Sequence, residues 1–236
     1  MTGPRSHPNP RLRRLRPPDG APAPNPYYRA CRRMLQVLLC AFWSVRIFDR
    51  HREPASGGVL YICNHQSYLD PMLMSFALRR PMNYMAAEFL FAPPGFRRLI
   101  RSLNAFPVRR GVADTRAMKE SVRRLKAGGQ LVVFAEGTRT WDGRIGPFLP
   151  GVALLARRAA AWTVPVVIDG AFEAWPRTQR LPRPGRIAVQ YGRPRRQTAC
   201  RARDGKDLLA GIRNEMIALQ ADLRDRTGRG PLHYEA

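Results

Sequence analysis

Short apolar runs recur along most of the chain and are separated by longer amphipathic stretches. Runs of four or five residues rich in branched apolar side chains are typical of buried strands. Such runs occur at Val59–Cys63, Leu131–Ala135 and Val164–Ile168, and further extended segments are expected at Asn83–Ala87, at Ala105–Arg109 and at 187–191, where apolar residues alternate. Each run is long enough for one strand and too short for an average helix, so the pattern predicts a sheet of several strands.

In the stretches between these runs, apolar residues recur with the period of a helix. Asp114 can cap a helix in which Met118, Val122 and Leu125 fall at i, i+4 and i+7. Further helices are expected at Tyr68–Leu78, Gly95–Leu103, Gly151–Ala160 and 208–223. Strands that alternate with helices predict an α/β fold, with a mostly parallel central sheet flanked by helices. Ligands bind such sheets where loops leave the carboxyl ends of the strands.

The N-terminal fifty residues differ from the rest. Residues 1–30 are rich in proline and arginine and predict a disordered basic tail. Residues 31–50 contain the apolar run Met34–Val45, which is shorter than the roughly 20 residues that span a bilayer. With arginines on both sides, this run predicts a helical segment that docks on a membrane surface, and a buried core helix is the alternative. The folded domain is expected to cover 51–226, and 227–236 is expected to be a flexible C-terminus.

The charge is strongly basic and is almost entirely arginine. The chain has 41 basic and 17 acidic residues, a net charge of +24, and its lysines are Lys119, Lys126 and Lys206. Arginine binds phosphate through a planar fork, so the partner is expected to be an anionic membrane surface or nucleic acid. No helix-turn-helix, zinc-finger or RNP-type pattern is visible, which favours the membrane. A basic nucleic-acid-binding protein is the non-enzyme alternative.

The four cysteines, Cys31, Cys40, Cys63 and Cys200, show neither a disulfide framework nor metal-ligand spacing. We therefore expect no metal site, and a reducing compartment.

The first candidate for chemistry directly follows the strand that ends at Cys63. His65 stands between this strand and a helix, and Asp70 follows five residues later. If the chain turns into a helix near Ser67, Asp70 can fold back onto the imidazole, fix its tautomer and stabilise its charged form. A base without a protein nucleophile suggests that the substrate's own hydroxyl is activated. A satisfied structural His–Asp pair is the alternative from spacing alone.

Two further clusters at strand ends are suited to anions. Gly137 allows close backbone approach, the hydroxyl of Thr138 and the backbone amides donate, and Arg139 offers a fork. Glu136 would repel a phosphate directly, so it is expected to fix an arginine or to accept from a substrate hydroxyl. Arg109 belongs to the other cluster, which begins at Phe106. A solvated basic turn is the alternative interpretation of that cluster.

In this order the clusters resemble the boxes of glycerolipid acyltransferases of the lysophosphatidate acyltransferase type. Asn64–Asp70 matches the NHxxxxD box, Phe106–Arg109 matches the phenylalanine-x-x-arginine box, and Phe134–Arg139 matches FPEGTR. Val164–Val167 is similar to a fourth, proline-containing box. Ala135 stands where the family usually has proline, Leu149 where it often has lysine, and Ile168 where a second proline is common.

The resemblance implies an O-acyltransferase that converts 1-acylglycerol-3-phosphate into phosphatidate in phospholipid biosynthesis. It implies that His65 is the general base, that Asp70 orients it, and that Arg109 with Glu136–Arg139 binds the acceptor. The acyl group would come from an acyl carrier protein or coenzyme A thioester, with no cofactor. A lyso-aminolipid, such as a lyso-ornithine lipid, or another lysophospholipid is the alternative acceptor. Such an enzyme is expected on the cytoplasmic face of the cell (inner) membrane.

Overall fold

The computed structural model describes residues 26–78, 80–109 and 111–234, and within them the strands form one sheet. The strands are β1 (Trp43–Phe48), β2 (Val59–Cys63), β3 (Met82–Ala87), β4 (Ala105–Val108), β5 (Gln130–Phe134), β6 (Trp162–Asp169), β7 (Gly185–Tyr191) and β8 (Arg195–Arg196). Their order across the sheet is β1-β7-β6-β2-β5-β3-β4, and β8 pairs with β6.

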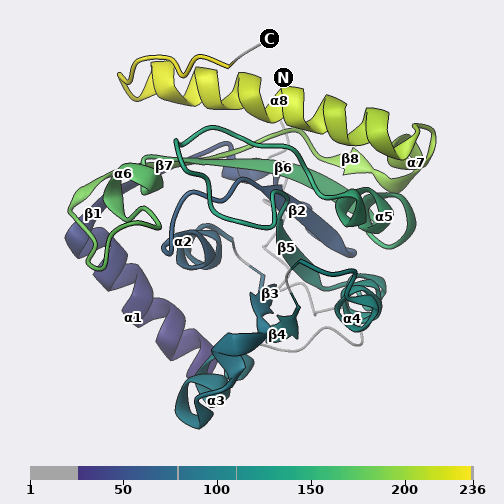
Figure 1. The fold of residues 1–236 in the computed structure, drawn as a ribbon, viewed down its shortest axis with the longest axis horizontal. Coiled ribbons are helices and arrows are strands. Elements are labelled where there is room, and N and C mark those ends of the chain that lie inside the picture. The colour runs from purple at the N-terminus through teal and green to yellow at the C-terminus, as the bar shows by residue number, and fades with distance from the viewer. Residues whose placement is uncertain (1–25, 79, 110, 235–236) are drawn as a thin grey trace, which may run out of the picture.

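Helices follow most of the strands along the chain (Figure 1). They are α1 (Pro26–Phe42), α2 (Asp70–Ala77), α3 (Pro94–Ser102), α4 (Thr115–Lys126), α5 (Pro150–Arg158), α6 (Ala171–Ala174), α7 (Gln197–Arg201) and α8 (Gly205–Arg226). Short 3-10 helices lie at η1 (Arg50–Arg52) and η2 (Glu88–Phe91). As the sequence predicts, Asp114 caps α4, because its side chain accepts from the backbone N–H groups of Arg116 and Ala117.

The five strands β2 to β6 run in one direction. The pairs β2–β5, β2–β6, β3–β5 and β3–β4 are all parallel. β7 is antiparallel to β6, and β1 is parallel to β7, so these two strands extend the sheet in the opposite direction. The predicted fold class, a mostly parallel sheet flanked by helices, is therefore confirmed. The carboxyl ends of β2 to β6 all meet at one edge, where parallel sheets bind ligands.

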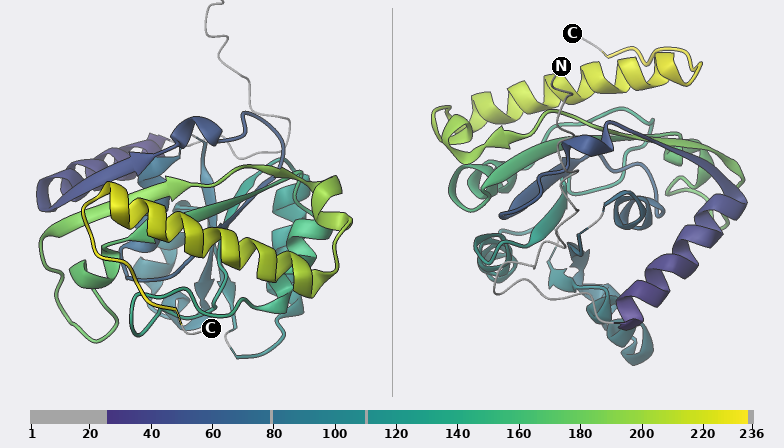
Figure 2. Two further views of the ribbon diagram at one scale, coloured as in Figure 1. Left: turned by 90° about the horizontal axis from the view of Figure 1, so that it is seen from above. Right: turned by 180° about the vertical axis from the view of Figure 1, so that it is seen from behind.

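Both faces of the sheet are covered by helices, and β2 shows why. All of its residues are buried, and successive side chains point to opposite faces. Tyr61 and Cys63 pack in a core with α1, α2 and α6. Leu60 and Ile62 pack in a second core with α4, α5, α7 and α8. Figures 1 and 2 show α8 and α5 on one side of the sheet and α1 and α2 on the other.

The helical prediction for residues 31–50 is wrong in its second half. The helix begins at Pro26, inside the segment predicted to be a tail, and ends at Phe42. Residues 43–48 form β1 instead, because Val45 and Ile47 alternate with polar residues and pack one face of the strand into the core. The rest of the predicted tail, residues 1–25, lies outside the described residues.

The C-terminal residues also differ from the flexible end that the sequence predicts. The hydroxyl of Tyr234 accepts from the backbone N–H of Ile145 at 2.9 Å, and the Arg229 guanidinium donates to Asp169 at 2.8 Å. These contacts tie the described residues after α8 to the domain. The sequence shows no sign of them, because both partners lie far away along the chain.

Candidate active site

The loop after β2 holds a histidine and an aspartate in direct contact. His65 Nδ1 lies 2.7 Å from Asp70 Oδ2. The same oxygen accepts from the backbone N–H groups of Gln66, at 2.6 Å, and Ser67, at 2.7 Å. Asp70 is the first residue of α2 and is fully buried. Because a carboxylate only accepts, the proton of the neutral imidazole resides on Nδ1, and Nε2 is free to take a second proton.

The imidazole is also held on its face. The ring of His65 stacks on Phe134, with centroids 4.1 Å apart and planes inclined by 17°. Phe134 is the last residue of β5 and pairs with Cys63 in the neighbouring strand. The side chain of His65 is only 8% exposed. Its orientation is therefore fixed before any substrate binds.

Two amide side chains anchor this loop to the adjacent strand and loops. Asn64 bonds both backbone groups of Ile168 in β6, donating to the carbonyl and accepting from the N–H at 2.8 Å each. Gln66 donates to the carbonyl of Gly143 at 3.0 Å and accepts from the N–H of Phe172 at 3.2 Å. The role of Gln66 was not predicted, because its partners are far away in sequence.

The carboxylate of Glu136 bonds the backbone on both of its oxygens, and its predicted contact with a substrate hydroxyl stays a prediction. Its Oε1 accepts from the backbone N–H of His65 at 3.0 Å, and its Oε2 accepts from that of Gly146 at 3.1 Å. Burial raises the pKa of Glu136 to about 7, although these two hydrogen bonds act in the opposite direction. The carboxylate thus links the histidine loop to the segment before α5.

This raised pKa predicts a pH dependence of stability. The pKa of Glu136 rises from 4.5 to about 7 on folding. Between these pH values the carboxyl is ionised in the unfolded state but protonated in the folded state, so the free energy of unfolding falls as the pH rises. We expect the free energy of unfolding of the wild type to fall by about 3 kcal/mol more than that of Glu136→Gln between these pH values. Urea unfolding of both proteins at several pH values measures this difference in the free energy of unfolding. The exposed Glu88→Gln is the control, and parallel curves for wild type and Glu136→Gln would contradict the prediction.

The turn after β5 brings Arg139 beside the histidine loop. Its Cζ lies 3.4 Å from the centroid of the Tyr68 ring, and Tyr68 follows His65 by three residues. Gly137 allows the turn, since its φ is +70° and a Cβ there would lie 2.5 Å from Leu149. Thr138 is exposed and sits near the guanidinium of Arg177. Among the described residues, Nη1 of Arg139 is buried and has no hydrogen-bond partner.

Arg177 is a neighbour of this turn that sequence reasoning missed. Its Nη1 donates to the carbonyl of Arg139 at 3.2 Å, and its guanidinium lies 3.7 Å from the centroid of the Trp141 ring. It lies in the segment between α6 and β7, outside all the motifs. In so arginine-rich a chain, no sequence signal distinguishes it from other arginines.

Arg109 lies at the same edge of the sheet but outside this cluster. It follows β4, three strand spacings or about 14 Å from β2. Its side chain is 56% exposed, with Nε 3.8 Å from Asp114 Oδ2. The structure therefore brings Arg139, and not Arg109, into direct contact with the histidine loop.

The hydroxyl and thiol nearest to His65 in sequence are buried or occupied. Ser67 is fully buried, donates to the carbonyl of Trp175 at 2.8 Å and accepts from the N–H of Leu69 at 3.1 Å. Cys63 is fully buried, and burial raises the pKa of its thiol. Neither side chain can therefore serve as a nucleophile.

A buried aspartate that orients a histidine, beside a serine and a cysteine that cannot attack, fits a transferase in which the base activates an alcohol of the substrate. The comparison with known sequences gives the family. The family model described as Acyltransferase matches residues 44–169, more than half of the chain. The protein therefore belongs to the acyltransferase family and is an acyltransferase enzyme.

Several relatives carry the same name. The chain is 25% identical over 186 residues to the 1-acyl-sn-glycerol-3-phosphate acyltransferase of Bacillus subtilis, covering 78% of this chain and 90% of that one. It is 31% identical over 138 residues to the enzyme of that name from Cocos nucifera, covering 57% of this chain and 45% of the relative. The chain thus spans nearly all of the bacterial relative but less than half of the plant one.

The fold has a counterpart among solved structures. The 1-acyl-sn-glycerophosphate (LPA) acyltransferase PlsC from Thermotoga maritima superposes with a TM-score of 0.71 at 21% identity. The match covers 86% of this chain and 82% of that chain. At this identity the likeness establishes a shared fold.

Proposed function

We propose that the enzyme transfers a fatty acyl group from a thioester to the free hydroxyl of 1-acylglycerol-3-phosphate, forming phosphatidate. The names of the relatives support this acceptor. The main structural support is the unpartnered Nη1 of Arg139, which lies beside the loop that holds the His65–Asp70 pair. A guanidinium so close to a general base can hold the phosphate of an acceptor whose hydroxyl meets that base.

The proposed reaction is a direct transfer. Nε2 of His65 takes the proton of the acceptor hydroxyl while the oxygen attacks the thioester carbonyl. Asp70 stabilises the imidazolium that forms. The tetrahedral intermediate collapses, the carbon–sulfur bond breaks, and the thiolate regains a proton from the imidazolium. The products are the new ester and a free thiol, from either an acyl carrier protein or coenzyme A.

A panel of acceptors tests this proposal. Purified enzyme and a labelled acyl thioester are incubated with lysophosphatidate, another lysophospholipid or a lyso-ornithine lipid, and the products are identified by mass spectrometry. We expect phosphatidate to form fastest. Preferential acylation of the aminolipid, or release of free fatty acid alone, would overturn the proposed acceptor.

Removing the guanidinium of Arg139 should weaken acceptor binding. We expect Arg139→Ala to raise the KM for lysophosphatidate about tenfold or more, since hydrogen bonds to charged groups contribute about 1.5–3 kcal/mol. Initial rates at saturating donor measure this. Arg196→Ala is a matched control, because Arg196 also stacks on an aromatic ring, that of Trp162, at the opposite edge of the sheet. An unchanged KM in Arg139→Ala would remove Arg139 from the acceptor site.

We also propose that the enzyme works on the cytoplasmic face of the cell membrane, which it contacts through α1 and α3. No helix in the described part of the chain is long and apolar enough to cross a bilayer. Instead, α1 exposes an apolar stripe of Tyr27, Met34, Leu38 and Phe42. Figure 1 shows one end of α1 beside α3, which exposes Phe96 and carries arginines. Apolar side chains among basic ones are typical of helices that lie in a membrane interface.

Charges placed on this stripe should prevent docking. We expect Met34→Glu with Leu38→Glu to lower the partition of the protein onto anionic vesicles about tenfold or more, because two exposed apolar side chains no longer enter the interface. Vesicle flotation measures this partition. Leu154→Glu on α5 is the control, and equal flotation of all proteins would exclude α1 as the docking surface.

A further inference from the structure

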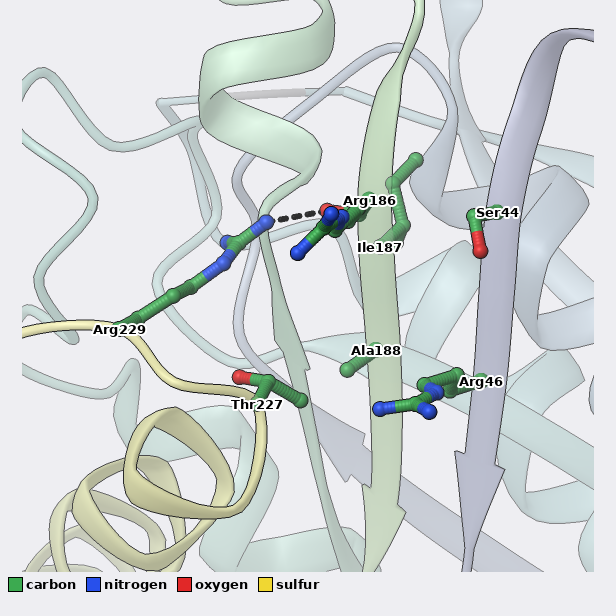
Figure 3. A pocket seen from close by; sticks show the side chains of 7 residues that line it. All are labelled: Ser44, Arg46, Arg186, Ile187, Ala188, Thr227 and Arg229. Atoms are coloured by element: carbon green, nitrogen blue, oxygen red, sulfur yellow. Dashed lines mark hydrogen bonds between the residues drawn. The ribbon is translucent and has the colours of Figure 1, made fainter.

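A cavity lies between β1, β7 and the residues that follow α8, away from the His65 loop. Its volume is about 330 Å³. Its polar lining consists of Ser44, Arg46, Arg186, Thr227 and Arg229. Figure 3 shows Arg46, Arg186 and Arg229 around β7, each from a different segment of the chain. The described residues that line the cavity include no acidic side chain.

Pairing between the two strands places two of these arginines on the same face. Ser44 pairs with Arg186, and Arg46 pairs with Ala188, so the two arginines are diagonal neighbours across β1 and β7. Ala188 leaves the space between them open, because its side chain is only a methyl group. Among the described residues, neither Arg46 nor Arg186 forms an ion pair. Two like charges facing one space repel each other, and a bound anion would relieve this repulsion.

The third arginine is held firmly in place. Arg229 Nη1 donates to Asp169 Oδ2 at 2.8 Å, and Arg224 Nη1 donates to the other oxygen of Asp169 at the same distance. Glu173 lies 3.9 Å from Arg229, and Arg229 also donates to the backbone carbonyl of Arg186. The acids beside the cavity are thus occupied by Arg224 and Arg229, and the charges of Arg46 and Arg186 remain uncompensated.

A glycine makes this arrangement possible. Gly170 follows Asp169 with a φ of +86°, and a Cβ there would collide with the guanidinium of Arg229 and the carbonyl of Arg186. Arg229 is therefore fixed from two sides, whereas the side chains of Arg46 and Arg186 are exposed and can adjust to a ligand. Because the charge of Arg229 is already paired with Asp169, Arg46 and Arg186 are the two guanidinium groups that would hold a tetrahedral anion.

We propose that this cavity binds a phosphate group, distinct from the one on the acyl acceptor. β7 lies two strand spacings, about 10 Å, from β2, and β1 lies one spacing further. The phosphate of a lysophosphatidate whose hydroxyl meets His65 cannot also occupy this cavity. The group recognised here belongs either to the headgroup of an anionic phospholipid in the membrane or to the phosphate of a soluble acyl donor. The site does not depend on the identity of the acceptor.

Binding of inorganic phosphate tests the site directly. We compare Arg46→Gln/Arg186→Gln with Arg193→Gln/Arg203→Gln, whose arginines are exposed and lie outside the cavity. Both pairs are made in an Arg139→Ala background to remove the anion site beside His65, and Tm is measured against phosphate concentration at constant ionic strength. We expect the cavity variant to bind phosphate about a hundredfold more weakly than the control, roughly tenfold per arginine. Equal phosphate dependence in the two variants would overturn the proposal.

Two further ligands identify the source of the phosphate. Loss of affinity for phosphatidylglycerol vesicles in the cavity variant, with coenzyme A binding unchanged, would assign the site to lipid headgroups. Loss of affinity for coenzyme A, with vesicle binding unchanged, would assign it to the donor. Both outcomes support a phosphate site, and neither requires turnover by the enzyme.

Discussion

Replacing His65 by alanine is expected to lower kcat for acyl transfer by about 10³-fold or more, because positioned bases contribute about 10²–10⁴-fold and no other base is held in this loop. Nε2 is the free nitrogen of an imidazole whose Nδ1 is bound by Asp70. The acceptor hydroxyl would then have to attack with its proton still attached. Transfer of a labelled acyl group, followed by product analysis, measures the loss.

The control for this experiment is His51→Ala, since His51 is exposed in η1 and lies outside the candidate site. We expect this variant to match the wild type. Because the ring of His65 stacks on Phe134, its removal leaves a gap, and His65→Gln fills part of that gap. Circular dichroism and urea unfolding show whether both His65 variants are folded. Wild-type turnover by a folded His65 variant would contradict the mechanism.

The second large effect is expected from Asp70→Asn. An asparagine has nearly the same shape but no charge, so it stabilises neither the imidazolium nor the Nδ1–H tautomer. We expect kcat to fall by about 10³-fold, with the KM for the acceptor changed little. Steady-state kinetics with both substrates varied separates the two parameters.

Part of the effect of Asp70→Asn could come from the backbone, because Asp70 also accepts from the N–H groups of Gln66 and Ser67. Asp204→Asn is a matched control. Asp204 also accepts a backbone N–H at the start of a helix, but it lies at the N-terminus of α8 and contacts no histidine. We expect Asp204→Asn to keep wild-type kcat. A similar small effect in both variants would make Asp70 a structural residue only.

The central elements could be predicted from the sequence because each is specified locally. β2 is a compact apolar run that is buried on both faces, and α4 has both a capping aspartate and an apolar stripe. The contact between His65 and Asp70 was predicted for the same reason. The two residues are five positions apart, in the connection between β2 and α2. The start of α2 places the carboxylate of Asp70 against the imidazole of His65.

What could not be predicted depends on partners far away in sequence. Residues 43–48 directly follow the apolar run of α1, so their short alternating pattern is seen as a strand once they pair with β7. The carboxylate of Glu136 was expected to contact an arginine or a substrate, but it accepts from two backbone N–H groups. Whether a carboxylate faces a ligand or a backbone amide is not encoded in the residues around it.

The arginines illustrate the same limit. With 41 basic residues in the chain, composition alone indicates an anionic partner but not where it binds. Folding places Arg139 against Tyr68 beside the candidate base, and it gathers Arg46, Arg186 and Arg229 at a different part of the sheet. Charge alone therefore does not identify a binding site, and the position of each guanidinium relative to its neighbours does.

Direct transfer to an alcohol held at His65 is tested most directly by initial rates over a matrix of donor and acceptor concentrations. Both substrates must be bound before either product leaves, so double-reciprocal plots should give intersecting lines, with negligible thiol release when the acceptor is omitted. Parallel lines, with a burst of thiol in the absence of acceptor, would indicate an acylated enzyme and contradict the mechanism.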